Sequence, residues 1–159
     1  MEHNEQDLRF MRRAIALATE SVRNGGGPFG AVIVKGGKII AEAANSVTID
    51  SDPTAHAEVN AIRKACRELG SFDLSGCTVY TSCEPCPMCL GAIYWAHLDA
   101  ISYGNNREDA AEVGFDDDFI YKEIEKPMVQ RTTPIRQLLQ AEALNSFIEW
   151  SDKADKTKY

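Results

Sequence analysis

The sequence has no long hydrophobic run. No uninterrupted apolar segment approaches the roughly 20 residues that a membrane-spanning helix requires. The opening residues, Met1–Glu5, do not have the pattern of a secretory signal peptide. We therefore expect a cytoplasmic protein with no membrane partner, in which the five cysteines stay reduced and are available to bind metal or to take part in chemistry.

The sequence also lacks internal repeats, low-complexity segments and an excess of basic over acidic residues. The 159 residues include 17 Lys and Arg against 24 Asp and Glu, and 44% are hydrophobic, which favours a single globular domain over residues 1–159. A chain of this length buries roughly 70% of its unfolded surface and needs no disulfide framework. Residues 105–125 hold two basic and eight acidic side chains, so phosphates are repelled there and no nucleic-acid partner is expected.

Hydrophobic periodicity predicts helices alternating with strands. The expected helices are 6–23, 55–69, 87–97 and 135–150. The expected strands are 31–35, 38–44, 77–82 and 100–103, with an edge strand near 128–130. This order predicts a three-layer α/β/α sandwich with a mixed five-stranded sheet, followed by a tail, 151–159, that has no core pattern of its own.

Metal-ligating residues gather at two predicted helix starts. His56 lies at one start, and Cys86 and Cys89 are three residues apart at the next, which puts both sulfurs on one helix face. One imidazole and two thiolates can hold Zn²⁺ and leave its fourth tetrahedral position to water, as in catalytic zinc sites. Glu58, two residues after His56, is placed to exchange a proton with that water.

Two other kinds of metal site would use some of the same residues. The cysteine run of an iron–sulfur protein would need a fourth thiol at position 93, where this chain has Ile93. A closed zinc site formed by His56, Cys83, Cys86 and Cys89 would describe a binding module without turnover, in which Glu58 has no task.

A family resemblance extends beyond these ligands. His56-Ala57-Glu58 with Pro85-Cys86-Pro87-Met88-Cys89 matches the signature of the zinc nucleobase deaminases. Segments 27–34, 52–58, 80–95 and 114–124 resemble the small bacterial guanine deaminases of the cytidine-deaminase fold, and the likeness covers about residues 8–159. The resemblance implies one zinc per subunit and hydrolysis of guanine by water to xanthine and ammonia. It also implies that Glu58 carries the water proton to ring N3 and then assists loss of the 2-amino group.

The same resemblance implies the substrate contacts. It assigns contacts with the base to Phe29, Asn45, His56, Trp95, Asp117 and Tyr159. Asp117 is suited to accept hydrogen bonds from the N–H and NH₂ groups at the reacting edge of guanine and to take part in proton relay, although spacing alone does not separate it from Asp116 and Asp118. The tail 151–159 is implied to exchange between the subunits of a homodimer, so that Tyr159 closes over the pocket.

Other deaminases share this zinc chemistry. The tRNA adenosine deaminases have similar length and both zinc motifs, but they need a basic surface and contacts to flanking nucleotides. The acidic stretch 105–125 argues against that reading.

Overall fold

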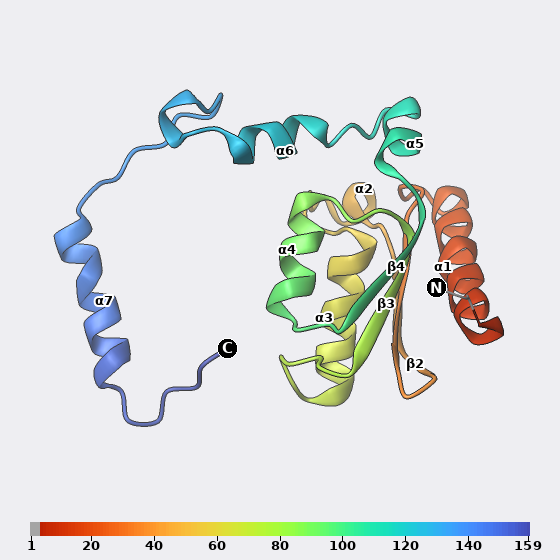
Figure 1. Ribbon diagram of the computed structural model, residues 1–159, viewed down its shortest axis with the longest axis horizontal. Coiled ribbons are helices and arrows are strands. Elements are labelled where there is room, and N and C mark those ends of the chain that lie inside the picture. Colours follow the sequence, from red (N-terminus) through yellow and green to blue (C-terminus); the bar gives the residue numbers. More distant parts are fainter. Residues whose placement is uncertain (1–3) are drawn as a thin grey trace. The chain divides into compact units, whose positions relative to one another are not determined.

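The computed structural model describes residues 4–159 and divides the chain into two compact units (Figure 1). The first unit ends at Asp118 and the second runs from Phe119 to Tyr159. No helix among the described residues combines the length and the apolar character needed to cross a membrane.

A mixed four-stranded sheet forms the centre of the first unit. Its spatial order is β2-β1-β3-β4. The antiparallel hairpin of the first two strands turns at Gly36 and Gly37, both with positive φ, and β3 is antiparallel to β1 but parallel to β4. The strands are β1 (Gly30–Lys35), β2 (Lys38–Ala44), β3 (Cys77–Cys83) and β4 (Ala100–Asn105).

Helices cover both faces of this sheet, which confirms the predicted three-layer α/β/α fold (Figure 1). α1 (Glu5–Arg23) packs on one face, and its core includes Phe10. α3 (Ala57–Leu69) and α4 (Pro87–Trp95) lie on the other face. The short helices α2 (Val47–Asp50) and α5 (Arg107–Glu112) follow β2 and β4.

The predicted edge strand at 128–130 is wrong. Met128–Gln130 form a 3₁₀ helix, η1, and the sheet of the described residues has four strands rather than five. Pro127 supplies no N–H to a ladder, and its carbonyl instead accepts a local bond from the Gln130 N–H at 2.8 Å. The other helices in this part of the chain are α6 (Asp118–Glu125) and α7 (Gln140–Asp152), the latter starting five residues after the expected position 135.

Gly30 allows α1 to lie close against β1. A Cβ at this position would be 2.3 Å from the Ala14 carbonyl oxygen and 2.7 Å from Cβ of Leu17. Both atoms belong to a helix packed against the buried sheet, so neither can move independently.

We predict that Gly30→Ala destabilises the fold by about 1–3 kcal/mol, because the added methyl group forces α1 away from the sheet. Gly91→Ala is the matched control: Gly91 is helical and an added Cβ meets nothing within 4 Å. This control should be neutral or up to about 1 kcal/mol stabilising. Urea unfolding of both variants measures the difference, and equal stabilities would contradict the prediction.

Candidate metal centre

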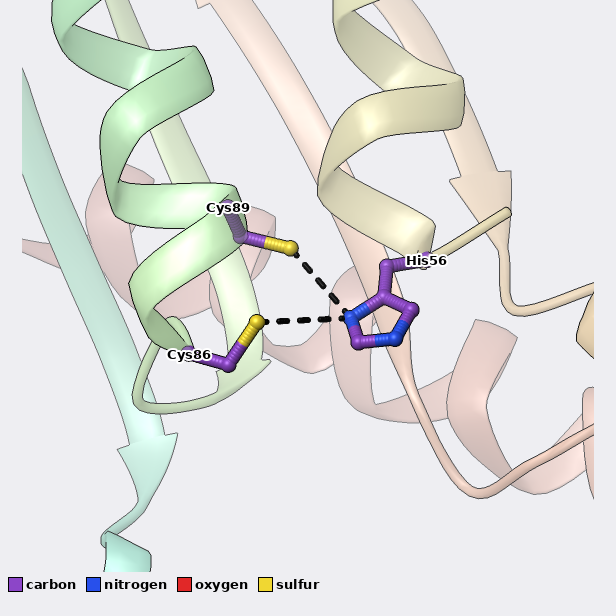
Figure 2. A group of neighbouring side chains, drawn as sticks. All are labelled: His56, Cys86 and Cys89. Atoms are coloured by element: carbon purple, nitrogen blue, oxygen red, sulfur yellow. Dashed lines mark hydrogen bonds between the residues drawn. The ribbon is translucent and has the colours of Figure 1, made fainter. Parts of the chain in front are cut away.

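The candidate metal ligands come from the starts of two helices on the same face of the sheet (Figure 2). His56 is the N-cap of α3 and Cys86 is the N-cap of α4. Cys89 lies in the first turn of α4, after Pro87, whose fixed φ suits a helix start. The three ligands therefore sit on regular elements, where partial positive charge from the helix ends favours thiolates.

The ligand atoms have the spacing of a zinc site. Nδ1 of His56 is 3.5 Å from Sγ of Cys86 and 3.4 Å from Sγ of Cys89, and the three atoms lie within 4.8 Å of one another. Tetrahedral Zn²⁺ with bonds of about 2.0 Å to nitrogen and 2.3 Å to sulfur would separate N and S by about 3.5 Å. The residues therefore fit zinc, with one coordination position left for a further ligand.

The protonation of the two thiols favours metal binding. The pKa of Cys86 is lowered to about 4, first because the Cys89 thiol hydrogen-bonds to it and then because His56 does. The same bond raises the pKa of Cys89, and the bond to Cys86 raises the pKa of His56. Zinc is bound by thiolates, so a bound cation displaces the proton that remains on Cys89.

Glu58 lies buried beside this cluster. Its side chain is 5% exposed, and burial raises the pKa of its carboxyl group. Oε1 accepts a hydrogen bond from the Thr81 hydroxyl at 2.9 Å, and Oε2 accepts one from the Cys89 thiol at 3.3 Å. One carboxyl oxygen is thus held by β3 while the other faces the metal ligands.

Cys83 is not part of the ligand cluster. Among the described residues, the cluster of metal-ligating side chains consists of His56, Cys86 and Cys89. The Cys83 thiol donates instead to the Asn106 carbonyl at 3.8 Å, and burial raises its pKa to about 11, so it is a neutral thiol. The closed four-ligand site gains no support from this arrangement.

Asn45 lies at the end of β2, which a main-chain hydrogen bond joins to the start of α3. The Ser46 N–H donates to the Ala55 carbonyl at 2.9 Å, which ties the end of β2 to the start of α3. Oδ1 of Asn45 accepts from the backbone N–H groups of Gly27 and Val47 at 3.3 and 3.2 Å. These bonds fix the amide and reserve its nitrogen for donation to another group.

Asp117 lies near enough to the cluster for the charge of Cys86 to act on its carboxyl group. It is half-buried, and its pKa is raised first by burial and then by the negative charge of Cys86. Asp116 instead uses Oδ1 to accept from the Asp118 N–H at 3.0 Å. Phe115 anchors this loop, since its ring packs edge-on against Phe29 with centroids 4.9 Å apart.

Two predicted contact residues lie apart from the cluster or outside this unit. Trp95 is the last residue of α4, about 12 Å along the helix axis from its start, and is 66% exposed. Tyr159 belongs to the second unit and is 75% exposed. The roles assigned to both residues stay predictions.

Sequence reasoning missed three side chains that support the site: Thr81, Phe115 and Arg107. Thr81 holds Glu58, Phe115 contacts Phe29, and Arg107 donates to Glu84 at 2.8 Å. No pattern in the neighbouring sequence points to these three residues, because each contacts a residue that is distant in sequence. Glu84 was visible inside the cysteine motif, but its partner was not.

Comparisons with known proteins agree with this geometry. Residues 4–105 match the family described as the cytidine and deoxycytidylate deaminase zinc-binding region. The chain is 60% identical over 151 residues to guanine deaminase of Bacillus subtilis (strain 168), covering 94% of this chain and 97% of that protein. It is 40% identical over 99 residues to the tRNA-specific adenosine deaminase of the same organism, covering 62% of each chain. An X-ray structure of guanine deaminase from Bacillus subtilis has a TM-score of 0.93 at 57% identity, covering 100% of this chain and 99% of that one.

We predict that Cys86→Ser and Cys89→Ser each weaken zinc binding by more than about 100-fold, since lesser changes around metal ligands already cost 10–100-fold. Cys83→Ser is the matched control and should retain the metal, because its thiol bonds to Asn106. Zinc content after dialysis against a chelator series measures the effect. Release of zinc by Cys83→Ser would instead favour a closed four-ligand site.

Proposed function

Because this chain belongs to the cytidine and deoxycytidylate deaminase zinc-binding family, we propose that it catalyses hydrolytic deamination of guanine to xanthine and ammonia. The buried Glu58 carboxyl group beside the three metal-ligating side chains His56, Cys86 and Cys89 supports this reaction most directly. The choice of guanine is supported by the extent of similarity. The guanine deaminase relative aligns over 151 residues, whereas the tRNA-specific deaminase aligns over 99.

Glu58 is the proton carrier in this proposal. Zinc, when bound, supplies Lewis acidity that lowers the pKa of a water molecule and makes it a nucleophile at neutral pH. Glu58 accepts a proton from that water as oxygen attacks C2 of the base, and passes it to ring N3. It then takes the second water proton from the hydroxyl group now on C2 and delivers it to the 2-amino nitrogen, so that the C2–N bond breaks, ammonia leaves and a carbonyl remains. Thr81 keeps the carboxyl group oriented throughout by its 2.9 Å hydrogen bond.

The remaining residues select the base. Guanine presents N–H and NH₂ donors at its reacting edge, and the Asp117 carboxylate accepts from them. The Asn45 amide nitrogen donates to an acceptor of the base, because its oxygen is occupied by two backbone N–H groups. Phe29, held by Phe115, packs against the ring plane. Cytosine and adenine present a different order of donors and acceptors to this set.

We predict that the zinc-loaded protein releases one ammonia and one xanthine per guanine consumed. Adenine, cytosine and a tRNA anticodon stem should react far more slowly, because they do not match the Asp117 acceptor and because the acidic 105–125 stretch repels phosphates. Product chromatography of parallel incubations decides the substrate. Inosine formed in the stem, with guanine untouched, would establish the tRNA deaminase alternative instead.

We predict that Glu58→Gln lowers kcat by at least about 10²–10⁴-fold, since the amide is nearly isosteric but cannot carry the proton. Zinc content should remain that of the wild type, because Glu58 is not a ligand in this proposal. Steady-state kinetics measures the change in kcat, and metal analysis of the same preparation measures the zinc content. Retained turnover by Glu58→Gln would remove the central step of the mechanism.

We also propose that the chain acts as a single deaminase domain in a homodimer, with the tail 151–159 exchanged between subunits. Support comes from the apolar side chains that α7 leaves exposed: Leu144, Phe147, Ile148 and Trp150 are 43–73% exposed. Such a cluster on one helix is typical of a surface that a second copy covers. In the dimer, Tyr159 of one subunit closes over the base, and Trp95 contributes to the wall of a pocket.

We predict that the wild-type protein in solution has twice the 17.6 kDa mass of one chain. Phe147→Asp should give monomers, because it places a charge in the apolar α7 surface. Asn145→Asp is the matched control on the same helix and should stay dimeric. Light scattering after size-exclusion chromatography measures the masses, and a monomeric wild type would contradict the proposed exchange.

We propose that the protein works in the cytoplasm. All five cysteines are free thiols, and two of them are the proposed zinc ligands, so a reducing compartment preserves the site.

A further inference from the structure

The side chain of Asn60 joins the two ends of the connection between β2 and α3. Asn60 lies half-buried in the first turn of α3. Its amide nitrogen donates to the Ala44 carbonyl at 3.0 Å, to the Ser46 hydroxyl at 3.0 Å and to the Ala55 carbonyl at 3.3 Å. An amide nitrogen carries two hydrogens, so three acceptors use its full donor capacity. The Ser46 N–H donates to the same Ala55 carbonyl at 2.9 Å, which brings the two ends into direct contact.

Both carbonyls that Asn60 holds come directly before a residue of the proposed site. Ala44 is the last residue of β2 and is followed by Asn45. Ala55 is followed by His56, the N-cap of α3 and one of the metal-ligating residues. A shift of either carbonyl therefore moves the backbone that carries a base contact or a metal ligand.

The other hydrogen bonds of Asn45 lead away from α3. Its N–H donates to the Phe29 carbonyl at 3.0 Å, and its carbonyl accepts from the Ser21 hydroxyl at 3.2 Å. Its side-chain oxygen accepts from two backbone N–H groups of neighbouring segments. These bonds fix Asn45, which is 7% exposed, against α1 and the segment before β1. The connection to the start of α3 runs through Asn60 and the Ser46 backbone instead.

We propose that Asn60 is a positioning residue that sets the distance between Asn45 and His56, and with it the fit of guanine between the Asn45 amide and the metal centre. This inference rests on the proposed deamination of guanine. Without the Asn60 donor, two carbonyls and a hydroxyl each lose a partner, and the end of β2 is held to α3 by fewer bonds. The base then no longer reaches the Asn45 amide and the metal centre at the same time.

The test compares Asn60→Leu and Asn60→Asp with the matched control Lys64→Met. Asn60→Leu removes the donor with little change in size, and Asn60→Asp keeps the shape of the side chain but replaces the donor by an acceptor. Nζ of Lys64 donates to the Glu42 carbonyl at 3.2 Å, so it also joins α3 to β2, one helical turn further along. Each change is made in wild type for kinetics and in Glu58→Gln for binding, where equilibrium dialysis with labelled guanine gives Kd without turnover. Zinc content and a urea unfolding curve are measured on every sample.

Asn60→Leu should raise both Kd and KM for guanine by at least about 5-fold, since small displacements of positioning groups already cost this much. The change in kcat should be far smaller, because the Asn45 contact binds the base equally before and during reaction. Zinc content should be unchanged. Asn60→Asp should have a larger effect, because its carboxylate repels three acceptor oxygens, whereas Lys64→Met should leave both constants unchanged. In the Asn45→Ala background, Asn60→Leu should raise Kd little further, because both changes act on the same contact.

Three results would each overturn this role: unchanged guanine affinity in the two Asn60 variants, an equal loss of affinity in Lys64→Met, or an undiminished effect of Asn60→Leu when Asn45→Ala is also present. Loss of zinc from Asn60→Leu would likewise reject it and assign Asn60 to support of the metal ligand. Failure of the proposed function is recognised separately. In that case the wild type does not turn over guanine, and the Glu58→Gln parent does not bind it.

Discussion

The meeting of two helix starts at the end of a buried strand is the constraint on which the site depends. β3 is antiparallel to β1 and parallel to β4, so its carboxyl end has a fixed position in the middle of the sheet. Cys86, three residues after the end of that strand, is the N-cap of α4. The fully buried Ala57, Ala61 and Ala65 let α3 lie close to the same face of the sheet. Small side chains at this interface bring His56 near both sulfurs.

This arrangement concentrates negative charge in a partly buried place. Glu58, Asp117 and Glu84 lie near two thiols, of which at least Cys86 is ready to lose its proton. Helix N-termini, Arg107 and a bound divalent cation offset this charge. A divalent cation bound by the two sulfurs would reduce the repulsion that acts on these carboxylates.

Much of this fold was predictable because its elements have strong local patterns. The first helix, the hairpin with its Gly36-Gly37 turn and the ligand set follow from periodicity, turn chemistry and spacing. The strand expected at 128–130 was wrong because three residues are too few for hydrophobic periodicity to distinguish a strand from a helical turn. Pro127 favoured the helical turn that the structure has there. Thr81 and Arg107 were unpredictable for another reason: their partners, Glu58 and Glu84, are 23 residues away in sequence, and only the tertiary fold pairs them.

In the proposed mechanism the metal ligands all lie within one region of the chain, whereas the base contacts come from that region and from the segment that follows it. The family match covers residues 4–105, which include the zinc ligands and Glu58, whereas Arg107, Phe115 and Asp117 follow it. A segment after β4 can change its side chains without moving the metal ligands, because those ligands belong to α3 and α4. Phe115 and Arg107 connect this segment to Phe29 and Glu84, so a substitution after β4 also has to be compatible with these two contacts.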